Sequence, residues 1–70
     1  MTKPTVNENV IGENAFLIIG MARSALRRAG KHDESNEMSN RCLRAGSYEN
    51  LIEICKEYVD FVNVNGDEDE

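Results

Sequence analysis

The sequence predicts an all-α fold, namely a small three-helix domain with an irregular N-terminal arm and an acidic C-terminal tail. Three observations predict it. Apolar residues recur at helical spacing in three segments, a helix-capping side chain precedes each segment, and a glycine follows the first and the second. The expected helices span about residues 14–29, 34–44 and 48–62. The chain then divides into an arm (1–12), a helical domain (13–62) and an acidic flexible tail (63–70).

The arm lacks helical periodicity and contains Pro4 and Gly12, so we expect irregular backbone, extended around Val6 and residues 10–11. Asn14 follows as the cap of the first helix, because its side chain accepts hydrogen bonds from free backbone N–H groups. Gly30 ends this helix, since glycine tolerates the left-handed conformation that helix ends often need.

The first helix is apolar on two sides. Its predicted core face consists of Ala15, Ile18, Ile19, Ala22, Ala25, Leu26 and Ala29. The opposite side carries long apolar residues beside Gly20, which costs about 1 kcal/mol relative to alanine inside a helix. Either the arm, through Val6, Val10 and Ile11, or a second protein surface is expected to cover this side. The candidate partner-binding residues are Phe16, Leu17, Gly20, Met21, Ser24, Arg23, Arg27 and Arg28.

The second and third helices differ in apolar content. Asp33 is the expected cap of the second helix, whose thin apolar stripe contains Met38, Cys42 and Ala45, with Gly46 at its end. Ser47 is the expected cap of the third helix, the clearest amphipathic segment in the chain. Its apolar face consists of Tyr48, Leu51, Ile52, Cys55, Tyr58, Val59 and Val62.

Charge is unevenly distributed along the chain. The net charge is −5, and the last four residues are all acidic. The middle of the chain is basic, with the cations Arg23, Arg27, Arg28, Lys31, Arg41 and Arg44. The outward face of the third helix is mostly acidic and consists of Glu49, Asn50, Glu53, Lys56, Glu57 and Asp60. A helix with such a face would repel phosphates, which disfavours a DNA-recognition helix.

The residues whose side chains are suited to catalysis or metal binding do not form a recognisable catalytic or metal site. His32 is the single histidine, and it lies in the expected connector after Gly30. Zinc prefers four ligands in closely spaced pairs, which one histidine and two distant cysteines do not supply. We therefore expect no catalytic residue, no cofactor-binding residue, no metal ligand and no enzyme. Cys42 and Cys55 are expected to be buried free thiols, with a disulfide or redox role as the alternative.

The sequence predicts a cytoplasmic protein without a membrane span. The longest apolar run covers residues 15–19, whereas a bilayer span needs about 20 residues. The first ten residues, MTKPTVNENV, lack the apolar stretch of a secretory signal.

Four short motifs carry a resemblance: ENAF (13–16), IIG (18–20), ALRRAG (25–30) and AGSYENL (45–51). Over residues 12–62 the chain resembles a family of small phage, prophage and bacterial proteins with the pattern Gly-Asn-Ala-Phe…Gly…Arg-Ala-Gly…Gly-Ser/Asp-Tyr-Glu-x-Leu. It departs from this pattern by having Glu13 in place of glycine and by its longer acidic tail. The resemblance implies a phage-type accessory origin and no assigned chemistry, because the motif residues belong to caps, turns and core.

Together these features predict a small non-enzymatic interaction protein, derived from a phage, that binds a larger host macromolecule. The expected partner is a host protein complex, such as a bacterial defence complex that the protein inhibits. A second copy of the chain, which would form a homodimer, is the other expected protein partner. The alternative is a nucleic-acid accessory protein that uses the basic surface of the first two helices. No small-molecule substrate, membrane or cofactor is expected.

Overall fold

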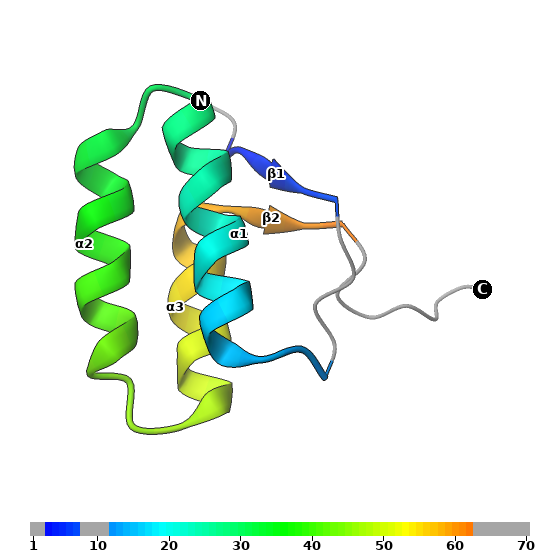
Figure 1. The fold of residues 1–70 in the computed structure, drawn as a ribbon, viewed down its shortest axis with the longest axis vertical. Coiled ribbons are helices and arrows are strands. Elements are labelled where there is room, and N and C mark those ends of the chain that lie inside the picture. Colours follow the sequence, from blue (N-terminus) through cyan, green and yellow to red (C-terminus); the bar gives the residue numbers. More distant parts are fainter. Residues whose placement is uncertain (1–2, 8–11, 63–70) are drawn as a thin grey trace.

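The computed structural model of the chain describes residues 3–7 and 12–62. In chain order the elements are β1 (Thr5–Val6), α1 (Ala15–Arg28), α2 (His32–Leu43), α3 (Tyr48–Tyr58) and β2 (Asp60–Phe61). Each helix packs on the other two, and the strand pair lies beside α1 on the side away from α2 (Figure 1). The predicted three-helix fold is therefore confirmed, with two very short strands added to it.

Two of the three predicted helix caps are present. The side-chain oxygen of Asn14 accepts a hydrogen bond from the Phe16 N–H at 2.7 Å. The Ser47 hydroxyl accepts one from the Asn50 N–H at 3.1 Å. Gly30 has a φ of 77°, so the turn after α1 uses the left-handed backbone that glycine was expected to supply.

The prediction that Asp33 caps the second helix is wrong. The helix begins at His32, and its cap residue Lys31 provides no side-chain hydrogen bond. The Lys31 N–H instead donates to the carbonyl of Leu26 at 2.8 Å, which closes the turn directly after α1. The connector is therefore shorter than expected, and Asp33 lies within the first turn of α2.

The third helix ends earlier than predicted. It was expected to reach residue 62, but it stops at Tyr58, and Val59 already has extended backbone with φ −138° and ψ 159°. The chain then runs parallel to β1, with Val6 aligned to Phe61. The Asp60 N–H donates to the carbonyl of Pro4 at 2.9 Å. Hydrogen bonds to the N-terminal arm therefore replace a last helical turn.

The core lies between the three helices and the strand pair. Its buried hydrophobic residues are Val6, Ile18, Ile19, Ala22, Ala25, Leu26, Met38, Cys42, Ala45, Leu51, Cys55, Val59 and Phe61. Three members of the predicted apolar faces, Ala29, Tyr48 and Val62, are exposed instead, because each lies at or beyond an element end.

The described part of the arm contributes one residue to this core. Val6 is extended, as predicted, and only 2% exposed, so it packs inside the fold. Val10, Ile11 and the acidic tail at 63–70 fall outside the described residues. No helix in the described part of the chain is long and apolar enough to cross a membrane.

Candidate functional site

The outer face of α1, defined here by Phe16, Leu17, Gly20, Met21, Ser24 and Arg28, lines an open hollow of about 420 Å³. These are six of the eight residues predicted to bind a partner. The side chain of Phe16 is 73% exposed and that of Leu17 is 48% exposed. Large apolar side chains gathered on one exposed face are typical of interaction sites. The outer face is therefore the main candidate site of this protein.

Gly20 lies in the middle of the outer face. A Cβ atom added at this position would have no heavy atom within 4 Å among the described residues. Packing within the described part of the fold therefore gives no reason for glycine here. The absence of a side chain leaves room for another molecule to approach the α1 backbone closely.

The two remaining predicted residues, Arg23 and Arg27, lie elsewhere. They line a second hollow of about 170 Å³ between the C-terminal half of α1 and the start of α2, called here the inter-helix hollow. Its other lining residues are His32, Ser35 and Asn36. The sequence prediction missed Ser35 and Asn36. Their spacing of three and four residues from His32 places all three on one helical face, but His32 was expected to lie in a connector, so this signal was not used.

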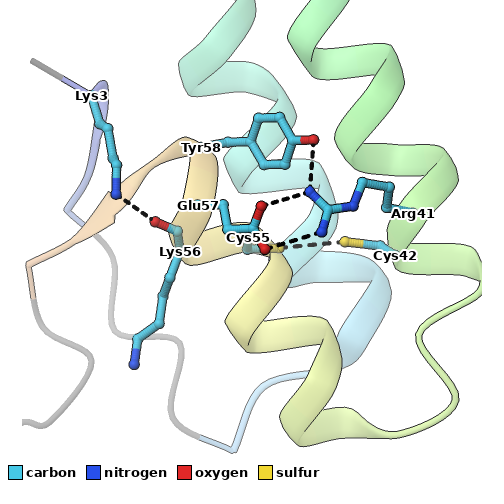
Figure 2. A network of polar contacts seen from close by, with 7 residues as sticks. All are labelled: Lys3, Arg41, Cys42, Cys55, Lys56, Glu57 and Tyr58. Atoms are coloured by element: carbon cyan, nitrogen blue, oxygen red, sulfur yellow. Dashed lines mark hydrogen bonds and ion pairs between the residues drawn. The ribbon is translucent and has the colours of Figure 1, made fainter. Parts of the chain in front are cut away.

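Arg41 forms a network with α3 that Figure 2 shows in close view. Its guanidinium donates to both carboxylate oxygens of Glu57, at 2.7 and 3.0 Å, and to the Tyr58 hydroxyl at 3.0 Å. The hydrogen bonds from Arg41 lower the pKa of the Glu57 carboxyl, and those to Glu57 and Tyr58 raise the pKa of Arg41. Arg41 therefore joins α2 to α3, and its charge is largely neutralised by Glu57.

The two cysteines face each other across the core. Both are buried, as predicted, and neither is in a disulfide. Burial raises the pKa of both thiols, and the neighbouring Cys42 further raises that of Cys55, to about 12. A thiol that stays protonated is a poor nucleophile, so neither cysteine is poised for covalent chemistry.

His32 lies far from both thiols, whose sulfur atoms are 3.6 Å from each other. It is exposed at the first position of α2, and Cys42 follows ten residues later on the same helix. At 1.5 Å per residue this separation is about 15 Å, so these two residues cannot act as a nucleophile and base pair. Residues 3–7 and 12–62 also contain no group of three or more His, Cys, Asp or Glu side chains that is arranged to hold a metal ion.

Comparisons with protein-family models, with curated proteins and with solved structures gave no match to this chain. The function is therefore inferred from the arrangement of its residues. The described fold offers an exposed apolar helix face with a cation at one end.

Proposed function

We propose that this protein is a small non-enzymatic interaction protein that binds a larger protein through the outer face of α1. The observation that carries the proposal is the exposure of Phe16 and Leu17 on the same helix face. A few side chains buried at the centre of an interface, with aromatic ones prominent among them, supply most of its binding energy. Phe16 is the expected anchor, because it is the most exposed of the large hydrophobic side chains in the described fold.

Gly20 supports close contact with the partner. A glycine inside a helix costs about 1 kcal/mol relative to alanine. A partner that packs against the backbone at Gly20 would gain contact area that any side chain would block. The hollow around Gly20 is open and has room for a side chain that projects from the partner.

The charge of the outer face indicates the chemistry of the partner. Arg28 lines one end of the hollow, and Arg27 is exposed next to it in the last turn of α1. Among the described residues, no carboxylate lines the hollow. An apolar surface flanked by carboxylates would therefore complement this face and would orient the partner along α1.

The size of the outer face favours a larger partner over a second copy of the chain. The helix has 14 residues, so its face covers about 20 × 10 Å, and two such faces in contact bury about 400 Å². Stable interfaces bury at least about 1,000 Å². A partner must therefore also contact the surface around α1, and a larger protein offers more surface for this than a second chain of 70 residues.

The resemblance to small phage and prophage proteins supports a bacterial host protein as the partner. A component of a defence complex, inhibited when its own interaction surface is occupied, fits this kind of binding. The arrangement of the arginines gives less support to the nucleic-acid alternative. Arg41 is paired with Glu57, and the acidic side chains of α3 are exposed.

Differential capture tests the proposal. Wild-type protein, Leu17→Glu and a control variant, Leu43→Glu, are immobilised and exposed to a bacterial lysate. Leu43 is a suitable control because it is 67% exposed on α2 and does not line the hollow. A protein retained by the wild type and the control but lost with Leu17→Glu is then purified and titrated against all three by calorimetry.

We expect Leu17→Glu to weaken binding by at least about tenfold, equivalent to roughly 1.4 kcal/mol, and Leu43→Glu to leave it unchanged. Equal binding by Leu17→Glu and wild type would exclude the outer face as the interface. Sedimentation equilibrium of the wild type provides a second check. A stable dimer that Leu17→Glu dissociates would assign the outer face to a second copy and overturn the proposal of a larger partner.

A further inference from the structure

The inter-helix hollow has a lining that differs from the rest of the surface. Its lining residues in the described part of the chain carry two guanidinium groups, an imidazole, an amide and a hydroxyl, and none of them carries a carboxylate. Every one of these groups can donate a hydrogen bond. The hollow lies between two helices that a short turn at Gly30 connects, so its position is fixed by the packing of α1 against α2. Such a site is built to receive an acceptor-rich, negatively charged group.

Two polar atoms at this site are buried without a hydrogen-bond partner among the described residues. They are the hydroxyl oxygen of Ser35 and the Nε atom of Arg23. Ser35 is only 1% exposed, which is unusual for a polar residue in a small domain. Buried donors that lack an acceptor cost about 1–3 kcal/mol each. Both residues line the hollow, so an anion that reaches these two atoms from there would supply the missing acceptors.

The first turn of α2 separates its donors from its acids. His32, Ser35 and Asn36 fall on the helix face that lines the hollow. At 100° per residue Glu34 points away from that face and Asp33 lies at its edge, and both are exposed. The start of a helix also carries partial positive charge, and no side chain of Lys31 caps the free N–H groups of α2. The local field therefore favours an anion even though the whole chain is acidic.

From these observations we infer that the inter-helix hollow binds a single phosphate group, either as inorganic phosphate or as the end of a small phosphomonoester. Arg23 and Arg27 supply charge-assisted hydrogen bonds, and Ser35 and Asn36 supply neutral donors. A hollow of about 170 Å³ holds one tetrahedral oxyanion and does not follow an extended phosphate backbone. This inference uses a different surface from the outer face of α1, so it stands independently of the proposed function.

The test is a titration with sodium phosphate at constant ionic strength, followed by the amide NMR signals of the ¹⁵N-labelled full chain. Sodium chloride at the same ionic strength is the control. Signals of His32, Ser35 and Asn36 should shift saturably, with a Kd on the order of 1 mM or tighter. Shifts that chloride reproduces, or that do not saturate, would overturn the inference.

Three variants sharpen the test. Arg27→Gln should weaken phosphate binding about tenfold, because it removes a charge-assisted donor from an exposed position. Arg44→Gln, which removes an exposed cation at the other end of α2, should leave binding unchanged. Ser35→Ala should weaken binding and also raise the stability of the free protein, because it removes a buried hydroxyl without a partner. Equal affinity of all three variants and the wild type would contradict the assignment.

Two further titrants identify the source of the phosphate. O-phosphoserine, a small phosphomonoester, should shift the same signals as inorganic phosphate. A single-stranded DNA 12-mer should not bind more tightly than these small anions. Tight binding of the oligonucleotide with a steep salt dependence, together with no saturable response to phosphate, would replace the single-phosphate site with a nucleic-acid surface.

Discussion

The sulfur atoms of Cys42 on α2 and Cys55 on α3 lie 3.6 Å apart in the core, within hydrogen-bond distance of each other (Figure 2). Cys55 is fully buried and Cys42 is 3% exposed. This contact joins the two helices close to the Arg41–Glu57 ion pair, so a buried sulfur pair and an exposed ionic pair stabilise the same helix interface. The reactivity of the thiols reports how firmly this interface is closed.

We predict slow modification of both thiols in the folded protein. The raised pKa values keep the thiolate fraction low, and the rate for Cys55 should keep rising toward pH 12, beyond the ordinary thiol value of 9.0. The measurement is the rate of reaction with a disulfide reagent at several pH values, with the urea-unfolded chain as the control. Equally fast reaction of the folded and unfolded chains would show that the α2–α3 interface opens readily.

Replacing Gly20 by alanine should stabilise the isolated protein by up to about 1 kcal/mol. The added methyl group meets no atom within 4 Å among the described residues, and it favours the helical backbone. Urea unfolding followed by circular dichroism measures the change. A loss of stability would mean that something in the folded chain already occupies this space. The same substitution should weaken binding to the proposed larger partner, because it obstructs the hollow.

The Arg41–Glu57 pair should stabilise the folded protein at neutral pH, and this contribution should be lost in acid. Because the pKa of Glu57 is lowered in the folded state, the unfolded chain binds its proton more readily. The contribution is therefore present above the ordinary glutamate value of 4.5 and is lost as pH falls through the lowered pKa. Arg41→Met should destabilise the protein slightly at neutral pH and have a smaller effect in strong acid.

Arg44→Met is the matched control for this comparison, because Arg44 is exposed at the end of the same helix. Unfolding by urea at a series of pH values gives the difference between each variant and the wild type. A difference for Arg41→Met that does not depend on pH would indicate lost packing against Tyr58, whose ring centre lies 5.6 Å from the guanidinium carbon.

Val6→Ala should destabilise the protein by about 2–3 kcal/mol, because it leaves a cavity in a closely packed core. Val6 is 2% exposed, whereas its neighbour Thr5 in the same strand is exposed. Thr5→Ala is therefore the control, and we expect it to change stability by less than about 0.5 kcal/mol. Similar values for the two variants would show that the arm does not contribute to the core as the structure indicates.

The sequence pattern was sufficient to predict the structural features that depend on residues close together in the chain. The helical spacing of apolar residues located all three helices, and the side chains of Asn14 and Ser47 marked two of their starts. The angular positions around α1 also identified six residues that line one hollow. Each of these features follows from residues within one or two helical turns of each other.

Features that depend on distant partners could not be predicted in this way. Val59 continues the helical spacing of α3, but it also alternates with Phe61 as strand residues do. The choice between the two is made by β1, more than 50 residues away, through hydrogen bonds to Pro4 and Val6. Similarly, the burial of Ser35 depends on how α1 packs against α2, since its own segment is polar and suggests a solvated face.

The register of the strand pair has a consequence for protein synthesis. Val6 is added to the growing chain 55 residues before its partner Phe61. The helices can begin to form while the chain is still growing, since their contacts are local. The pairing with β2 must wait until residue 61 has been added, so Val6 has no strand partner while the three helices are being synthesised.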